Sequence, residues 1–140
     1  MATPDELADE LASMSLFADL SHPEVEAAAR IFTEIWFGEG ERIIRQGLSG
    51  TGFYVVIDGE VAVRADGRDT AVLGRGAFIG EGSALLGELP SADVVALRRT
   101  RCLSLAGPAL HDFLIAHPAV AYRMLLEQTR RLRATTRARA

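Results

Sequence analysis

The stretch FYVVIDGEVAVRADGRDTAVL, residues 53–73, decides the fold. It contains three short apolar runs that are separated by Asp58-Gly59 and by Asp66-Gly67. Because an Asp-Gly pair tolerates the positive φ of a tight turn, each pair predicts a β-hairpin. Strands at this spacing, with no helical pattern between them, indicate antiparallel β-structure rather than parallel βαβ units.

The same alternation of short apolar runs and glycine turns extends over residues 33–106. We therefore expect an all-β barrel or sandwich in this region. The predicted strands are Ile35–Phe37, Ile43–Ile44, Phe53–Ile57, Val61–Val63, Ala71–Leu73, Ala92–Ala96 and Cys102–Leu105.

Helical segments flank this β region on both sides. In residues 1–32, apolar side chains recur at helical spacing, and SHPE at 21–24 has the form of a capping box. In residues 107–140, His117-Pro118 interrupts the helical pattern, which predicts a short helix followed by a longer one. One side of the longer helix carries a mainly apolar stripe, formed by Met124, Leu125, Gln128 and Leu132. This stripe either packs on the β-roll or forms a dimer seam.

Length and charge distribution restrict the class of protein. The 140 residues suffice for one domain, 1–140, in which residues 1–118 carry nine arginines against eighteen acidic residues. Residues 119–140 carry six arginines against one acidic residue, so an acidic body ends in a basic tail. The acidic N-terminus is unlike a signal peptide, and the apolar runs are too short to span a bilayer, which predicts a cytoplasmic protein.

The residue pattern contains no motif of a catalytic or metal site. The single cysteine, Cys102, excludes an internal disulfide and an all-cysteine zinc site, and its apolar neighbours predict a core residue. The histidines, His22, His111 and His117, lie in the helical flanks, without partners at the spacing of a nucleophile or metal cluster. We therefore expect no enzyme activity, no metal and no resident cofactor.

Four segments together resemble the cyclic nucleotide-binding domain, the family of the catabolite activator protein and of the regulatory subunits of cyclic-nucleotide-dependent kinases and channels. The resemblance implies a mostly β fold with flanking α-helices, built as an antiparallel eight-stranded jelly-roll β-barrel. It also implies an N-terminal helix pair and two C-terminal helices. The segments are FGEGERIIRQG (37–47), GTGFYVVIDGEVAV (50–63), LGRGAFIGEGSALLGELPSADVVAL (73–97) and RCLSLAGPALHDFLIAHP (101–118).

The resemblance places the family's phosphate-binding cassette at Gly80-Glu81, where a short helix begins. In this family the backbone N–H groups of that helix point at the cyclic phosphate, because unpaired amides and the helix dipole favour an anion. Glu81 matches the glutamate that accepts a hydrogen bond from the ribose 2′-hydroxyl. The amides would be those of Gly82, Ser83 and Ala84. On the next strand, Ser91 and Ala92 match the small residues that contact the phosphate and the base.

The sequence departs from this pattern where the family has the arginine that pairs with the phosphate, which here is Pro90. Proline removes that charge, and Asp93, two residues past Ser91 on the same predicted strand face, is expected to repel a phosphate. A charge-assisted hydrogen bond contributes about 1.5–3 kcal/mol, so its loss lowers affinity by roughly tenfold to more than a hundredfold. Arg75 and Arg123 are the candidate substitute cations.

Four interpretations remain open. We favour a non-catalytic regulatory or interaction module that binds cAMP and cGMP weakly or not at all, and that acts on a protein partner or a second copy through its C-terminal helices. The second is a genuine cAMP sensor that uses Glu81 and a substitute arginine, and the third is an acidic pocket for an uncharged or cationic ligand. In the fourth, the basic tail contacts nucleic acid, which is disfavoured because the family's transcription factors use a helix-turn-helix domain that we do not expect here.

Overall fold

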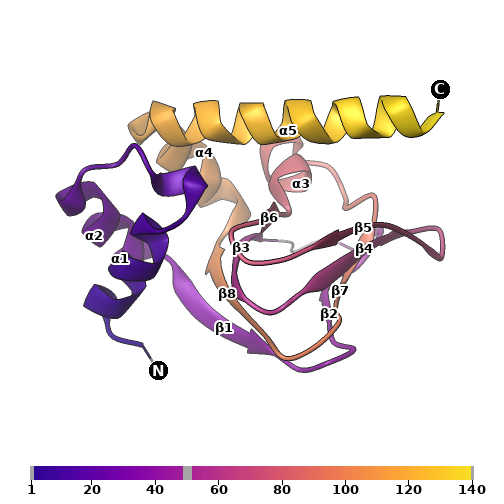
Figure 1. Cartoon of the computed structure of the whole chain (residues 1–140), viewed down its shortest axis with the longest axis horizontal. Coiled ribbons are helices and arrows are strands. Elements are labelled where there is room, and N and C mark those ends of the chain that lie inside the picture. The colour runs from indigo at the N-terminus through magenta and orange to yellow at the C-terminus, as the bar shows by residue number, and fades with distance from the viewer. Residues whose placement is uncertain (1, 49–51, 140) are drawn as a thin grey trace.

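The computed structural model describes residues 2–48 and 52–139. Figure 1 shows the N-terminal helices at one end of the strands, and the long C-terminal helix running along one side of them. The helices are α1 (Pro4–Ala12), the short η1 (Ser15–Phe17), α2 (His22–Ile31), α3 (Glu81–Leu86), α4 (Gly107–Ala116) and α5 (Pro118–Arg139). The strands are β1 (Thr33–Phe37), β2 (Arg42–Ile44), β3 (Phe53–Asp58), β4 (Val61–Ala65), β5 (Arg68–Leu73), β6 (Phe78–Ile79), β7 (Asp93–Ala96) and β8 (Thr100–Leu105).

The strands form two antiparallel four-stranded sheets, in the orders β1-β8-β3-β6 and β2-β7-β4-β5. This is the jelly roll that the resemblance implied, with flanking helices. Strand β6 was not among the strands predicted from the residue pattern. It has only two residues, Phe78 and Ile79, so it is too short to produce a periodic signal.

The two Asp-Gly turns have different roles. Asp66-Gly67 closes the predicted hairpin between β4 and β5, with φ of 51° and 79° as a tight turn requires. The prediction of a hairpin at Asp58-Gly59 is wrong, because β3 and β4 belong to different sheets and do not pair. A Cβ on Gly59 would lie 2.4 Å from the Thr100 hydroxyl oxygen, so the turn packs closely against β8 as it crosses between the sheets.

Two apolar clusters form the core. One lies between the helices and the β1-β8-β3-β6 sheet and includes Phe53, Val55 and Ile57. The other fills the inside of the roll and includes Val56 and Cys102. Strand β3 therefore buries both of its faces, which explains why its sequence is a continuous apolar run rather than an alternating one.

A capping box stabilises α2, and a cluster of charges joins α1 to the roll. The predicted capping box is confirmed, since the Ser21 hydroxyl accepts from the Glu24 N–H and the Glu24 carboxylate accepts from the Ser21 N–H. Arg101 of β8 pairs with Glu10 of α1 and with Glu34 of β1, at 2.9 Å from the latter. These contacts set α1 and η1 beside the roll, where they border a cleft described below.

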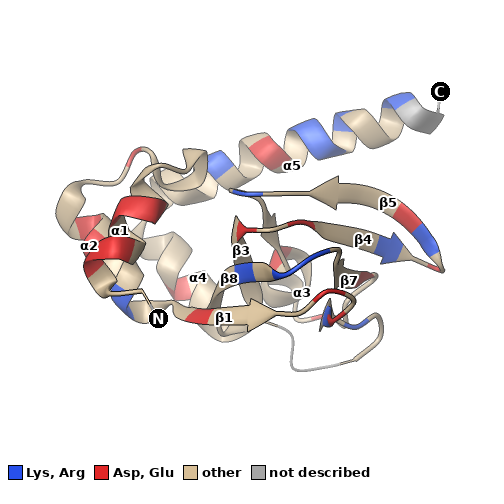
Figure 2. Cartoon of the chain, turned by 60° about the horizontal axis from the view of Figure 1, so that its bottom comes forward, with Lys and Arg blue, Asp and Glu red and all other residues tan. Residues whose placement is uncertain are grey.

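Helix α5 packs on the roll along one face only. The predicted break at His117-Pro118 separates α4 from α5. The predicted stripe is split: Met124 is buried in the core and Gln128 contacts the cassette, whereas Leu125 and Leu132 are 61% and 67% exposed. Figure 2 shows most of the basic residues of α5 along its distal half, whereas Arg123 near its start pairs with Asp19.

Candidate functional site

Helix α3 and its flanking glycines form the cassette at the position that the resemblance implied. Gly80 is the N-cap of α3 and has a left-handed backbone, with φ of 87°. Gly87 ends the helix, also in the left-handed region. The first turn of a helix leaves N–H groups without acceptors inside the helix, so Gly82 and Ser83 keep the amides that were assigned to a ligand.

Ala84 does not share that role. Its N–H donates to the Gly80 carbonyl oxygen at 3.1 Å, which is the first bond of the helix. Its side chain packs against the helical core. The resemblance placed Ala84 in the right helix but one residue beyond the free amides.

A cavity of about 190 Å³ lies against the cassette. Drug-sized ligands occupy cavities of roughly 300–1,000 Å³, so this one is small for a nucleotide while α5 keeps its position. Of the predicted site residues, all except Ala84, Asp93 and the two arginines line it. The lining residues are Ile44, Val63, Leu73, Ile79, Gly80, Glu81, Gly82, Ser83, Pro90, Ser91, Ala92, Val94 and Arg131.

Pro90 and Asp93 have structural roles instead of electrostatic ones. Pro90 is buried, and its carbonyl oxygen accepts from the Gly47 N–H at 2.9 Å. Asp93 does not line the cavity, because its carboxylate accepts from the Gln46 N–H at 2.7 Å and lies 3.9 Å from Arg42. The expectation that Asp93 repels a phosphate is therefore not supported by its placement.

Neither candidate substitute cation reaches the cassette cavity. The Arg75 guanidinium donates to the Ile57 carbonyl oxygen at 2.7 Å and to the Ser13 hydroxyl at 2.9 Å. The Arg123 guanidinium forms two bonds with the Asp19 carboxylate, at 2.8 and 3.0 Å. Both arginines line a separate cleft.

The cation at the cassette comes from α5 and was not predicted. Arg131 lines the cavity, lies 3.4 Å from the Glu81 carboxylate and donates to the Phe78 carbonyl oxygen at 3.1 Å. Its guanidinium also covers the Phe78 ring, 4.5 Å from the centroid. The polar Gln128 in an apolar helix stripe was the available signal, because Arg131 follows it by three residues on the same face.

Glu81 is thereby held by the chain's own helix. Its Oε1 accepts from the Gln128 side-chain amide at 2.6 Å, in addition to the Arg131 contact. Its side chain is only 13% exposed, and within the described residues its Oε2 is buried without a hydrogen-bond partner. We call these contacts of Gln128 and Arg131 with Glu81 the α5 latch.

The remaining groups with possible chemistry are the single cysteine, Cys102, and the side chains of metal-ligating type. Cys102 is fully buried, and burial raises the pKa of its thiol to about 12, so it stays protonated at neutral pH. Residues 2–48 and 52–139 contain no cluster of three or more metal-ligating side chains. In the same part of the chain, no helix combines the length and hydrophobicity that crossing a membrane requires.

Comparisons with known proteins agree with this fold and cassette. The chain is 30% identical over 102 residues to a cGMP-dependent protein kinase of Caenorhabditis elegans. That alignment covers 69% of this chain but only 13% of the kinase. The structure of the Thermus thermophilus catabolite activator protein aligns with a TM-score of 0.75 and 32% identity, over 86% of this chain and 59% of that one. A regulatory subunit of a cAMP-independent protein kinase A from Trypanosoma brucei has the same fold, with a TM-score of 0.77 at 23% identity. The alignment covers 90% of this chain and 45% of that one.

The sequence profile of the cyclic nucleotide-binding domain matches residues 34–117, which is more than half of the chain. That segment contains both sheets, α3 and α4, and therefore the whole of the cassette. The chain belongs to the cyclic nucleotide-binding domain family and is a domain of the regulatory type.

Proposed function

We propose that this chain is a non-catalytic regulatory module whose cassette binds cAMP and cGMP weakly or not at all. The observation that carries the proposal is the position of charge around the cavity. Pro90 stands where the family has its phosphate-pairing arginine, and the only cation among the described lining residues, Arg131, is bonded to Glu81. A cyclic phosphate entering this cavity meets no free positive charge.

Two separate costs oppose cyclic-nucleotide binding. The missing arginine removes about 1.5–3 kcal/mol of charge-assisted hydrogen bonding. In addition, Gln128 and Arg131 already bind Oε1 of Glu81, so a ribose hydroxyl has to displace them or reach the buried Oε2. The fold does not specify the ligand, since one structure of this fold is of a kinase described as cAMP-independent.

The α5 latch also provides a mechanism for regulation. A ligand that occupies the cassette competes with Gln128 and Arg131 for Glu81, so it favours positions of α5 that differ from the latched one. A ligand shifts such an equilibrium only by its differential affinity for the two positions. Here that difference arises at Glu81, and α5 transmits it to a partner.

One observation favours a second candidate function, in which Arg131 is the substitute cation of a genuine cyclic-nucleotide sensor. Arg131 lines the cavity, and its side chain is 27% exposed. On binding, its guanidinium would exchange Glu81 for the phosphate. The two functions predict different effects of removing this side chain.

The variant Arg131→Ala separates them by isothermal titration with cAMP and cGMP. Under our proposal the wild type and the variant both bind weakly or not at all, because Arg131 is engaged by Glu81 and gives the phosphate no charge-assisted bond. Arg133→Ala, an exposed arginine two residues further along α5, is the matched control and is expected to leave the affinity unchanged. A loss of affinity in Arg131→Ala alone would instead establish the sensor.

We further propose that the outer face of α5 joins two copies of the chain. Tyr122, Leu125 and Leu132 are exposed on this face, and with Thr129 they follow the three-four spacing of a coiled-coil seam. The arginines beside them are complementary to the acidic body, residues 1–118, of a second copy. Such an interface combines apolar burial with charge attraction.

Sedimentation measurements test this interface. We expect the wild type to form dimers that weaken as salt is added, because salt screens exposed charges. The double variant Leu125→Ser/Leu132→Ser is expected to be monomeric, whereas Leu86→Ser, a 71% exposed leucine on α3, remains dimeric. A wild-type monomer at all protein concentrations would contradict the proposal.

A further inference from the structure

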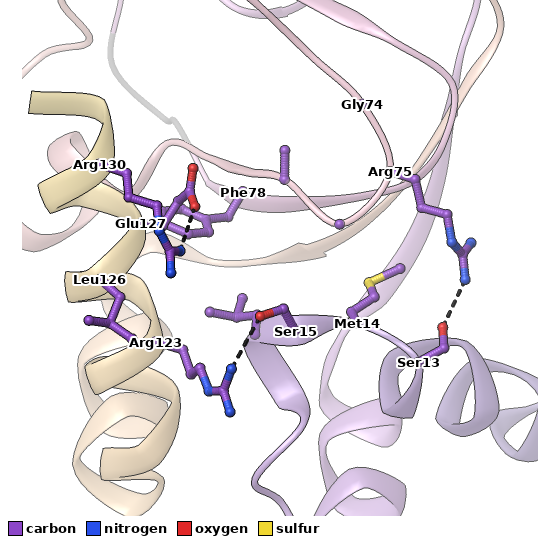
Figure 3. Close-up of a pocket in the computed structure, with 13 residues that line it drawn as sticks. Ser13, Met14, Ser15, Gly74, Arg75, Phe78, Arg123, Leu126, Glu127 and Arg130 are labelled. Atoms are coloured by element: carbon purple, nitrogen blue, oxygen red, sulfur yellow. Dashed lines mark hydrogen bonds and ion pairs between the residues drawn. The ribbon is translucent and has the colours of Figure 1, made fainter. Parts of the chain in front are cut away.

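A second cleft, with a volume of about 440 Å³, lies on the other side of α5 from the cassette cavity. Three segments that are distant in the sequence form it: Ser13–Leu16 from the end of α1 and from η1, the turn Gly74–Phe78 between β5 and β6, and α5. Figure 3 shows Arg75 on one side of the cleft and Arg123 and Arg130 on the other. The α5 residues in the lining are Arg123, Leu126, Glu127 and Arg130.

Arg75 is a positioned cation whose charge is not neutralised. Its two bonds go to the Ile57 carbonyl oxygen and the Ser13 hydroxyl, which are neutral acceptors. No carboxylate of the described residues lies within 4.0 Å of its guanidinium nitrogens. The guanidinium is therefore held in place while its positive charge remains available to an anion.

The cleft lining as a whole is positive, with three arginines and a single carboxylate, Glu127. Arg123 is already paired with the Asp19 carboxylate. Their hydrogen bonds raise the pKa of Arg123 and lower the pKa of Asp19. Arg130 is different: its side chain is 69% exposed and lies 3.4 Å from Glu127, which also lies 3.6 Å from Arg131. Because Glu127 is shared between two arginines, its single negative charge does not neutralise both of them, and the exposed Arg130 guanidinium keeps donors for a ligand.

The floor of the cleft is apolar. Met14, Leu16 and Phe78 are buried there, and Leu126 is half-buried on the α5 side. A cavity of this size lies within the roughly 300–1,000 Å³ range of small-molecule sites, which combine apolar walls with a few polar groups. The cleft thus offers guanidinium groups at its rim and apolar surface beneath them.

We propose that this cleft is a second ligand site, which binds a small organic phosphate with its phosphate on Arg75 and its apolar part over Phe78 and Leu126, while Arg130 adds positive charge on the opposite rim. Guanidinium groups match phosphate because they donate two parallel hydrogen bonds and are always charged. The positive cleft on an otherwise acidic body also attracts anions to this point. This site does not depend on whether the cassette binds a cyclic nucleotide.

A ligand in this cleft also bears on the cassette through α5. Glu127 and Arg130 face the cleft, while Gln128 and Arg131, each one residue further on, hold Glu81 on the other side. A ligand with its phosphate on Arg75 and its organic part on Leu126 adds contacts between the β5–β6 turn and α5. It therefore stabilises the latched position of α5, so the two sites are coupled.

The test is a titration of the full chain with AMP, followed by amide NMR, with adenosine as the matched ligand that lacks the phosphate. We expect AMP to bind saturably at submillimolar concentration and adenosine not to. The shifted amides should lie in Ser13–Leu16 and Gly74–Phe78, and not in the cassette helix α3. Shifts confined to α3, equal binding of adenosine, or no saturation by AMP would each overturn the proposal.

Variants complete the test. Arg75→Gln is expected to weaken AMP binding by about tenfold or more, because it removes the charge-assisted bond to the phosphate. Arg68→Gln, an exposed arginine on β5 outside the cleft, should bind AMP like the wild type. If Arg75→Gln does not fold, Arg130→Gln decides, because this second cation at the rim has a side chain that is 69% exposed, so its replacement leaves the core packing unchanged. An unchanged affinity in these cleft variants would show that the phosphate binds elsewhere.

Discussion

Replacing Gly80 with alanine lowers the free energy of unfolding by about 2–5 kcal/mol, because left-handed backbone costs an alanine about 1–2 kcal/mol and an overpacked site about 1–3 kcal/mol. Gly80 has a φ of 87°. A Cβ on it would lie 2.2 Å from the Gly52 carbonyl oxygen, which is a backbone atom and cannot rotate away. Urea denaturation followed by circular dichroism measures the loss.

Gly82→Ala is the matched control, two residues away in the same cassette. Gly82 does not have a positive φ, and a Cβ on it would meet nothing within 4 Å. Because alanine favours a helix over glycine by up to about 1 kcal/mol, this variant is expected to be as stable as the wild type or slightly more so. Equal denaturation midpoints for the two variants would contradict the close approach of Gly80 to Gly52.

Replacing Pro90 with arginine raises the affinity for cAMP or cGMP by roughly tenfold to more than a hundredfold, because it adds about 1.5–3 kcal/mol of charge-assisted bonding. Pro90 lines the cassette cavity between the cassette helix and Ser91. Because Gly82 and Ser83 line the same cavity, we expect an arginine side chain at position 90 to reach a phosphate on their N–H groups. Isothermal titration gives the change in affinity.

The control for this gain is Pro90→Gln, which has a long polar side chain but no charge. It should bind no better than the wild type, since charge and not length supplies the bond. Because Pro90 is buried and its carbonyl holds Gly47, circular dichroism must first show that both variants are folded. Similar affinities for Pro90→Arg and Pro90→Gln would mean that position 90 does not contact the phosphate.

Much of the fold could be predicted because its signals are local. The capping box at Ser21–Glu24, the turn at Asp66-Gly67 and the helix break at His117-Pro118 each depend on residues within a few positions of one another. The turn at Asp58-Gly59 has the same local signal as Asp66-Gly67 but a different outcome. Whether its strands pair is decided by their neighbours in the two sheets, and no local pattern contains that information.

The residues of the candidate site also fall into those that a local motif predicts and those that only contacts between distant segments bring together. The cassette positions from Gly80 to Ser83 follow from a contiguous motif, and all of them line the cavity. The contacts that decide the charge of the cavity do not follow from a contiguous motif. Arg131 and Gln128 reach Glu81 across 50 and 47 residues of sequence. Arg75 lies close to the cassette in the sequence and Arg123 lies near the start of the long helix, but Arg75 bonds to Ser13 and Arg123 to Asp19.

The most direct test of the central claim is isothermal titration of the wild-type chain with cAMP and with cGMP, up to millimolar ligand. We predict no saturable heat below the millimolar range, because Pro90 supplies no cation and the α5 latch holds Glu81. Micromolar binding that disappears in Glu81→Ala would contradict this account, and would mean that Arg131 leaves Glu81 to serve the phosphate.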